Sequence, residues 1–410
     1  MKPAFFIAQR LAIGDRKSFS AFIVRIAVLA IALSMSVMII ATCMVSGFSK
    51  EIKQRIFGFW GEIHITGFDN NESFESKPIR EDQVALTSLR RAKEVRNVAP
   101  FILKPGILKT KSDIEGIVLK GVDSSYDWKT IATYLKKGRL PQQSSDSDVH
   151  KEILVSQSTA NKLKLKVDDA VLVYFIRSDL AAPIGRKLKV CGIYHTGLEE
   201  YDKQFALVDI ALLRRLNQWQ EGQVAGYEVR LHDMEQMDTF KDSVYFKYID
   251  QSVNAQTMKE INRNIFEWLD LQKINEYLIL GFMLVVAVLN MITALIILIL
   301  DRTNMIGMLK AMGAKDTFIH RIFIYHAAYI ILKGLAWGNL IGLGVCALQH
   351  FTGFIKLNEQ NYYLTEAPVY FNITAILLLN VGTLLICTLV LLIPVRLVSR
   401  ISPMKAIRFD

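Results

Sequence analysis

The sequence contains few of the residues that crosslink a domain. Only four of its 410 residues are cysteines, and three of them, Cys43, Cys346 and Cys387, lie in long apolar runs. Cys191 is the one cysteine of the polar part of the sequence, so that part cannot form an internal disulfide. We expect the Cys191 thiol to be packed in the core of a strand.

The sequence also lacks the common motifs of catalysis and metal binding. It has no G-x-x-x-x-G-K-[ST] phosphate loop, no G-x-S-x-G nucleophile turn and no H-E-x-x-H zinc motif. His320 and His326 are six residues apart and do not share a helical face, and the acidic stretch "GLEEYD" is expected to be solvated. We therefore predict a chain that is not an enzyme, with no catalytic residue, no metal and no cofactor of its own.

Long hydrophobic runs, in contrast, are abundant. Apolar residues make up 51% of the chain, and the mean hydropathy is +0.26. Three runs carry no charge, Ile26–Ser49, Tyr277–Leu300 and Ala367–Val395, and a fourth, Ile322–Phe351, contains only Lys333. Each exceeds the roughly 20 residues that cross a bilayer as a helix. We predict four membrane spans, the first an uncleaved helix, and assign no role to Lys333.

Positive charges near the ends of these spans predict the orientation. Lysines and arginines gather before the first run, in the segment 301–321 and after the last run, whereas the loop after the third run has only Lys356 beside two glutamates. Cytoplasmic loops carry an excess of such residues. We expect both termini and segment 301–321 on the cytoplasmic side of the membrane, with the large polar block on the outer side. The net charge of +10 partly reflects this bias, and nucleic-acid binding is not expected.

The polar block alternates like strands in "GEIHIT", "IEGIVLKGVD" and "DDAVLVYFI", with helical segments between them. We predict an α-helical membrane protein with four transmembrane helices and a large α+β periplasmic domain of two subdomains between helices one and two. The expected boundaries are 1–20 amphipathic helix, 21–49 first span, 50–254 external domain, 255–276 amphipathic stalk helix, 277–300 second span, 301–321 cytoplasmic segment, 322–350 third span, 351–369 external loop, 370–395 fourth span and 396–410 tail.

The segment 301–321 contains a short amphipathic pattern. Met305, Met308, Leu309 and Met312 recur at helical spacing in "NMIGMLKAMGA", and Gly313 is placed to end the helix. Such a helix either rests on lipid headgroups or offers its methionines to a cytoplasmic partner. The residues alone favour neither interpretation.

Three glycines of the third span recur every fourth residue. Gly334, Gly338 and Gly342 remove the side chains from one face of the helix, which lets another helix approach closely. We predict a helix-packing role for them.

The chain resembles the lipoprotein-releasing, Lol-type permeases of ABC transporters, within the MacB/FtsX superfamily. The resemblance is carried by "FFIAQRL", "SGFSKEIKQRIFGFWGEIHIT", "GRLPQ", "KEILVSQSTANKLKLKVDDAVLVYF", the elbow "IGMLKAMGA" and the tail "ISPMKAIRF". The stretch "TGLEEYDKQFALV" is similar to the lipoprotein-releasing branch in particular. The resemblance implies a MacB-like external domain and a permease subunit that extracts lipoproteins from the inner membrane for transfer towards the outer membrane.

The resemblance also implies partners and contact residues. The elbow would be a coupling helix that contacts a separate ATPase dimer, which binds ATP and Mg, through Gly307, Met308, Lys310, Met312 and Gly313. A second permease subunit, the same chain or a sister, would complete a cleft for a triacylated lipoprotein. Phe48, Tyr362 and Tyr363 match the aromatic residues of that site, to which we add the apolar Met44, Phe282 and Met283. Pro183, Ile184, Gly185 and Arg186 resemble the base of a loop that docks a periplasmic lipoprotein carrier.

Two departures from the family pattern bear on the substrate. Asp168 stands where the family has glycine, and Ser34 and Met35 replace a glycine-containing pair in the first span. Two other functions remain open: a MacB-like exporter of drugs or peptides, and an FtsX-like activator of a cell-wall hydrolase.

Overall fold

The computed structural model describes residues 19–68, 74–75, 77–110, 113–142, 151–175, 183–358 and 364–396. The chain forms two compact units: a helical unit of residues 1–50, 268–356 and 366–410, and an external unit of residues 51–267 and 357–365. The expected N-terminal helix 1–18 and the tail after residue 396 lie outside the described residues.

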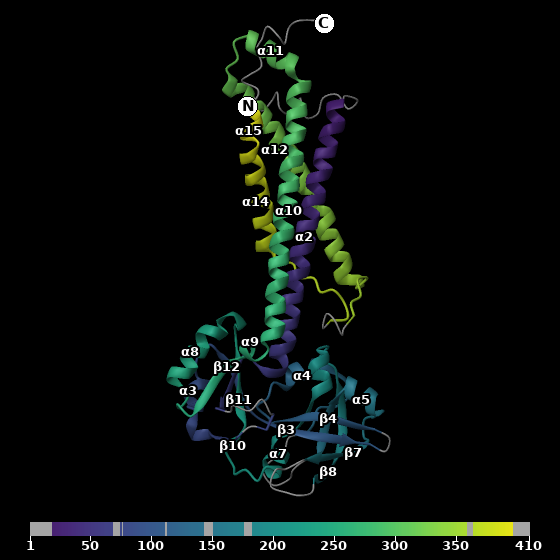
Figure 1. Ribbon diagram of the computed structural model, residues 1–410, viewed down its shortest axis with the longest axis vertical. Coiled ribbons are helices and arrows are strands. Elements are labelled where there is room, and N and C mark those ends of the chain that lie inside the picture. The colour runs from purple at the N-terminus through teal and green to yellow at the C-terminus, as the bar shows by residue number, and fades with distance from the viewer. Residues whose placement is uncertain are drawn as a thin grey trace. The chain divides into compact units, whose positions relative to one another are not determined.

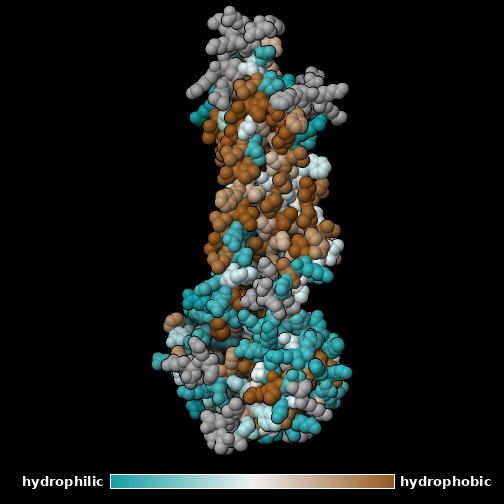
Figure 2. Space-filling model, turned by 45° about the vertical axis from the view of Figure 1, so that its right-hand side comes forward, coloured by the Kyte–Doolittle hydropathy of each residue, from teal (hydrophilic) through white to brown (hydrophobic). Residues whose placement is uncertain are grey.

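The helical unit is built from long apolar helices: α2 (Phe19–Trp60), α10 (Arg263–Asp301), α12 (Asp316–Thr352), α14 (Ile373–Val390) and α15 (Leu392–Val395), with the short α11 (Thr303–Ala311) at one end of the bundle (Figure 1). Within the described residues, four segments are long and apolar enough to cross a membrane: Phe22–Trp60, Arg263–Asp301, Asp316–Thr352 and Ile373–Val395. Their surfaces are predominantly hydrophobic (Figure 2). The four predicted spans are confirmed.

The helices are longer than the apolar runs that identified them. Helix α2 continues beyond Ser49 to Trp60, and α12 begins at Asp316, inside the segment assigned to the elbow. Helix α10 includes the expected second span and the part of the expected stalk from Arg263 onward. Hydropathy marks the part of a helix that lies in lipid, whereas backbone hydrogen bonding continues through the charged turns that follow.

Helices α2 and α12 pack through a glycine seam, formed by Gly334, Gly338 and Gly342 of α12. A Cβ atom at Gly338 would lie 2.6 Å from Cβ of Met35, and one at Gly334 would lie 2.7 Å from Cβ of Ile31. At Gly342 the corresponding distance to Cβ of Ile39 is 3.1 Å. All three glycines are buried, so the seam is held by close approach rather than by side-chain interdigitation. Met35 fits because a glycine faces it.

A pair of amides connects α12 to α14. Asn339 Nδ2 donates to Asn380 Oδ1 at 2.6 Å, and Asn380 Nδ2 donates to Asn339 Oδ1 at 3.0 Å. Reciprocal amide bonds satisfy polar groups that lipid cannot hydrate.

The external unit is organised around a 10-stranded sheet in the order β12-β1-β11-β3-β4-β9-β6-β8-β5, with β7 paired to β3 and β8. Among the strands of the described residues, only the β4–β9 and β6–β8 pairs are parallel. The strands are β1 (Ile63–Gly67), β3 (Val95–Lys109), β4 (Ile114–Val122), β5 (Leu135–Gly138), β6 (Glu152–Ser156), β7 (Ala170–Phe175), β8 (Ile184–Tyr194), β9 (Phe205–Asp209), β11 (Gly226–Leu231) and β12 (Val253–Thr257); a small sheet pairs β2 (Ile79–Arg80) with β10 (Gln223–Val224).

Short helices pack around this sheet and form two lobes with it, and the one sheet extends through both lobes (Figure 1). They are η1 (Glu81–Gln83), α3 (Leu86–Arg90), α4 (Trp128–Tyr134), α5 (Gln157–Leu163), α6 (Glu199–Gln204), α7 (Ile210–Leu216), η2 (Met234–Gln236), α8 (Met237–Lys247) and α9 (Met258–Ile261). The 15-residue strand β3 joins the lobes, because it pairs with β11 in one and with β4 and β7 in the other. The α+β architecture is confirmed.

The start of the predicted stalk helix is wrong. Residues 255–257 end strand β12, which pairs with β1, and the helical backbone begins only at Met258. Thr257 caps that helix: its side chain accepts from the Glu260 amide, and the Glu260 side chain accepts from the Thr257 amide. The helical conformation is interrupted at Asn262, before α10 begins. The alternating burial of Val253, Ala255 and Thr257 is the strand pattern that helical spacing further along obscured.

Candidate functional site

The elbow helix α11 exposes two of its methionines. Met308 is 55% exposed and Met312 is 76% exposed, whereas Ile306 and Gly307 are buried. Met305 and Leu309 pack against the apolar core of the helical unit. The expected methionine stripe is thus divided: one part anchors the helix, and Met308 with Met312 form the free face.

The remaining predicted coupling residues have different surroundings. Lys310 Nζ lies 3.0 Å from Asp316 Oδ1, which links the end of α11 to the start of α12, and its side chain is only 11% exposed. Gly313 follows Met312, the residue that caps the C-terminal end of α11. Its φ of +85° is in the left-handed region, where a residue with a side chain would be strained. Gly307 is buried, so it is not part of the surface that a partner would touch.

The predicted lipid-binding residues that the structure describes differ in their exposure. Met44 and Phe48 lie one helical turn apart on α2 and are partly exposed. On α10, Phe282 is 67% exposed, whereas its neighbour Met283 packs against the core. Tyr362 and Tyr363 lie outside the described residues.

The base of the loop between α12 and α14 packs against helix α2. Gln349 donates to the Ala367 carbonyl at 3.0 Å and accepts from the Ile355 amide at 2.8 Å, which fixes both sides of the loop base. The Tyr370 amide donates to the Cys43 carbonyl at 3.0 Å, and Lys50 Nζ lies 3.7 Å from the centre of the Tyr370 ring. Sequence reasoning missed Tyr370, although an aromatic residue directly before a span is a usable signal.

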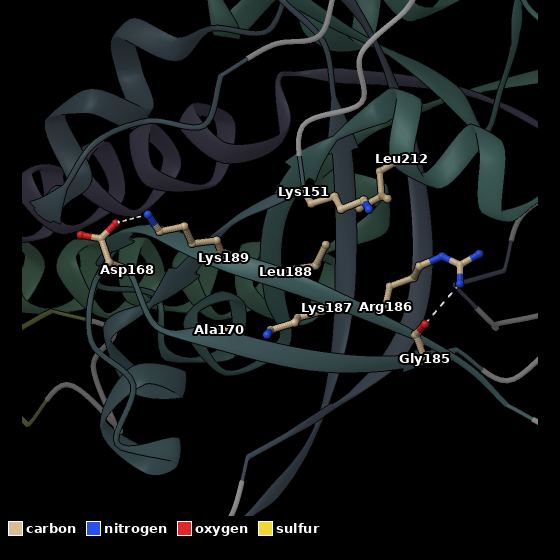
Figure 3. A pocket seen from close by; sticks show the side chains of 9 residues that line it. All are labelled: Lys151, Asp168, Ala170, Gly185, Arg186, Lys187, Leu188, Lys189 and Leu212. Atoms are coloured by element: carbon tan, nitrogen blue, oxygen red, sulfur yellow. Dashed lines mark hydrogen bonds and ion pairs between the residues drawn. The ribbon is translucent and has the colours of Figure 1, made fainter.

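A basic cavity of about 450 Å³ lies beside strand β8 in the external unit (Figure 3). It contains Gly185 and Arg186, two of the four residues predicted to dock a carrier; Ile184 begins the same strand, and Pro183 directly precedes it. Its lining is Lys151, Asp168, Ala170, Gly185, Arg186, Lys187, Leu188, Lys189 and Leu212. Four cations against one carboxylate favour an anionic partner surface.

Asp168 forms the acidic edge of this cavity. Its carboxylate lies 2.7 Å from Lys189 Nζ (Figure 3), and this bond holds the pKa of Asp168 below its ordinary value. Its φ of +73° is in the left-handed region, which explains why a glycine is suited to this position. Aspartate tolerates that conformation better than most residues.

The stretch "TGLEEYD" is a buried turn, and the expectation of a solvated acidic loop is wrong for Asp202. Asp202 is 1% exposed and accepts from the Thr196 amide at 3.1 Å, the Thr196 hydroxyl at 2.8 Å and the Gly197 amide at 3.2 Å. His195 Nδ1 lies 2.9 Å from Asp202 Oδ2, the oxygen that also accepts from the Gly197 amide. A carboxylate that accepts several backbone donors fixes a turn, because each lost bond would leave a buried polar group unpaired.

This turn lies against two long helices, near the end of α2 and at the start of α10. We call the group formed by Arg55, Thr196, Tyr201 and Asn262 the stalk contact. Arg55 Nη1 of α2 donates to the Thr196 carbonyl at 2.9 Å. Tyr201 donates to Asn262 Oδ1, at the break before α10, at 2.9 Å. A Cβ at Gly197 would lie 1.7 Å from Arg55 Nη1, so only glycine leaves room for the arginine. The motif therefore positions the helix ends.

No metal-binding arrangement was found in the part of the chain that the structure describes, since no three histidine, cysteine or acidic side chains gather there. The features of interest are two surfaces, the free methionine face of α11 and the basic cavity, and one internal contact, the stalk contact.

Comparison with known proteins places the chain in a family. Residues 26–245 match the MacB-like periplasmic core domain, and residues 277–403 match the FtsX-like permease C-terminal family. The chain is 22% identical over 412 residues to the lipoprotein-releasing system transmembrane protein LolC of Neisseria meningitidis, covering 96% of each chain. It is 23% identical over 427 residues to LolE of Haemophilus influenzae, covering 99% of each.

Among solved structures, the periplasmic region of MacB from Actinobacillus actinomycetemcomitans is 14% identical, with a TM-score of 0.33, over 50% of this chain and 92% of that chain. At that score the likeness does not by itself establish a common fold. The first family match, in contrast, covers more than half of the sequence. The chain is a multi-pass membrane protein of the transporting rather than the catalytic kind, and it belongs to the MacB/FtsX superfamily as a Lol-type permease.

Proposed function

We propose that this chain is the permease subunit of an ABC transporter that extracts lipoproteins from the inner membrane for transfer towards the outer membrane. The observation that carries the proposal is similarity over nearly the whole chain to relatives named as lipoprotein-releasing proteins, LolC and LolE alike. The "TGLEEYD" turn supports it, since that stretch resembles the lipoprotein-releasing branch.

The proposed motor is a separate cytoplasmic ATPase dimer that binds ATP and Mg. Support comes from α11, where Met308 and Met312 are exposed on a helix whose opposite side is packed into the core. Methionine adapts its shape to a partner's socket and has little reason to face water. In this proposal both termini and α11 lie on the cytoplasmic side and the large domain lies in the periplasm.

The proposed work is physical extraction. Each buried methylene of an acyl chain contributes about 0.8 kcal/mol to membrane anchoring, so a triacylated protein does not leave the bilayer unaided. Two permease subunits would form an apolar cleft near Phe48, and closure of the ATPases would expel the lipid towards the external domains. The cations of the basic cavity would then attract an acidic carrier surface near Arg186.

Reconstitution tests this proposal. The chain would be purified from its own membranes with the subunits that accompany it and placed in proteoliposomes that contain a triacylated lipoprotein. We expect an ATPase and a permease in the complex, and release of the lipoprotein that requires ATP. Co-purification of a cell-wall hydrolase or of an outer-membrane duct, with no release of lipoprotein, would contradict it.

A further inference from the structure

The C-terminal end of helix α2 is closed by two buried cations, Lys120 and Arg230, which we call the cation cap. Lys120 Nζ donates to the Phe59 carbonyl at 2.5 Å, and Arg230 Nη2 donates to the Gly58 carbonyl at 2.8 Å. Lys120 is 0% exposed and Arg230 is 3% exposed. The last carbonyls of a helix have no partner within it, so these side chains complete the backbone hydrogen bonding of the final turn.

Further donors reach the carbonyls of that turn. Tyr126 donates to the Phe59 carbonyl at 2.7 Å, and the Gly61 amide donates to the Phe57 carbonyl at 2.8 Å. His64 Nε2 lies 3.0 Å from the Trp60 carbonyl. The side-chain donors Lys120, Arg230 and His64 come from β4, β11 and β1, so three strands of the sheet hold one helix end.

The charges of the cap are balanced within the core. Glu228 Oε1 lies 2.6 Å from Lys120 Nζ, and Asp127 Oδ2 lies 3.4 Å from Arg230 Nη1. Burial lowers the pKa of Lys120 to about 8, while the Glu228 carboxylate acts in the opposite direction, so the ammonium is charged at neutral pH. Positive charge at a helix C-terminus also interacts favourably with the helix dipole.

Stability alone does not explain such a cap. Replacing a buried ion pair with apolar side chains of similar size is often neutral or stabilising, because the desolvation of both charges is avoided. A directed donor on each carbonyl does what an apolar pair cannot: it fixes the axial position and rotation of the helix end. Lys120, Arg230 and Glu228 are therefore better understood as positioning residues.

Helix α2 contributes residues up to Lys50 to the helical unit and Glu51–Trp60 to the external unit, as one unbroken helix. We propose that the cation cap is the point at which movement of the first span is transferred to the sheet of the external domain. With the cap in place, displacement of α2 pulls on β4 and β11; without it, the last turn unwinds and absorbs the displacement. This inference rests on the proposed function, because transport supplies the movement.

The test is a double variant, Lys120→Met with Glu228→Leu, in the complete complex in lipid nanodiscs and proteoliposomes. Removing both charges avoids a buried unpaired carboxylate, so the domain should stay folded. We expect amide exchange in the last turn of α2 to be about tenfold faster, since the charged donor to the Phe59 carbonyl is lost. Lipoprotein released per ATP hydrolysed should fall about fivefold or more, while ATP hydrolysis continues.

The matched control is Lys104→Met with Glu75→Gln. Lys104 is a buried lysine of strand β3, paired with Glu75 in the same domain, and its ammonium bonds Glu75 rather than helix α2. This variant should retain the release per ATP and the slow exchange of α2. Lys120→Arg, which keeps a cation at the cap, should recover much of the loss in transport.

The outcomes separate the two proposals. If wild-type complex releases no lipoprotein, the proposed function fails, whereas the exchange measurement still reports on the cap. If wild type releases lipoprotein and the double variant matches it in release per ATP, the transfer role is overturned. Equal loss in the Lys104 control would also overturn it, because the effect would then follow the loss of any buried lysine of this domain.

Discussion

Helix α2 is packed in two different ways along its length. In the helical unit the side chains of α2 pack directly on the backbone of Gly334, Gly338 and Gly342 of α12, which carry no side chain of their own. In the external unit its end is surrounded by charged donors, with Lys120 and Arg230 on its carbonyls. The same helix is thus held by shape at one end and by directed hydrogen bonds at the other.

The difference reflects the solvent that each region excludes. Between apolar helices in lipid there is no hydrophobic driving force, so small residues that permit close approach supply the attraction. At a helix end, backbone carbonyls need donors whatever surrounds them. A seam tolerates sliding by a small amount, whereas directed bonds fix one position. Substitutions at the two regions should therefore change the unfolding free energy by different amounts.

The largest effect is expected from Lys120→Met alone. It leaves the Glu228 carboxylate buried without its cation, which typically destabilises by about 3–5 kcal/mol. Chemical or thermal unfolding of the protein in nanodiscs would measure it. The Lys120→Met, Glu228→Leu double variant should regain most of the loss; an equally unstable double variant would mean that packing, not charge, is at stake.

Gly338→Ala should weaken the seam. The added Cβ would lie 2.6 Å from Cβ of Met35 and 2.9 Å from the Ala32 carbonyl oxygen. Overpacking of this kind costs about 1–3 kcal/mol. Gly344→Ala, on the same helix with no atom within 4 Å of the new Cβ, is the control and should leave the unfolding midpoint unchanged. Similar losses in both variants would argue against a specific seam.

Acid should destabilise the C-terminal end of α2 in the external unit more than the glycine seam, because His64 lies at that end. Burial, with Lys120 contributing, lowers the pKa of His64 to about 3. Between pH 6.5 and 3 the unfolded chain therefore binds a proton that the folded state does not, and this histidine lowers the unfolding free energy by about 1.4 kcal/mol per pH unit as pH falls. Glu62 and Glu228, whose pKa values burial raises, act in the opposite direction.

His64→Gln isolates this contribution, because glutamine can still donate to the Trp60 carbonyl but does not titrate. The difference in unfolding free energy between variant and wild type should change by that slope between pH 6.5 and 5. Parallel pH profiles for the two proteins would show that His64 is already charged in the folded state.

The smallest effect on stability is expected at the elbow. Met308→Asp with Met312→Asp changes two exposed side chains and should alter the unfolding free energy by about 0.5 kcal/mol or less. It should nevertheless uncouple ATP hydrolysis from lipoprotein release, which side-by-side assays of the reconstituted complex would detect. Met308→Leu with Met312→Leu keeps the apolar shape and should transport normally. Full transport by the aspartate pair would exclude docking at this face.

The sequence predicts the parts of the fold that depend on local patterns. Uncharged runs identify the spans, and the fourfold spacing of Gly334, Gly338 and Gly342 identifies a close helix contact. The extension of α2 to Trp60 is hidden because Lys50, Glu51, Lys53 and Arg55 end the hydropathy signal while the helix continues. Strand β3 is hidden by Pro100 and Pro105, which usually argue against a strand of this kind.

The site residues divide in the same way. The free face of α11 follows from helical spacing once burial is known, but spacing alone could not say which methionines are anchored. Lys120 and Glu228 are charged residues in the buried parts of their strands. A charged residue among apolar strand residues is a usable hint that it has a buried partner. Their pairing depends on β4 and β11 both lying beside β3, a tertiary arrangement that no local pattern specifies.

The unbroken course of α2 also decides how the periplasmic part can be studied in isolation. A soluble fragment that begins after Trp60 would retain Lys120 and Arg230 but lose the carbonyls they bind, leaving two cations in a dry interior. A fragment that begins near Glu51 keeps the last ten residues of α2, whose carbonyls accept the hydrogen bonds of these two cations. Binding studies with soluble carriers therefore need the longer version.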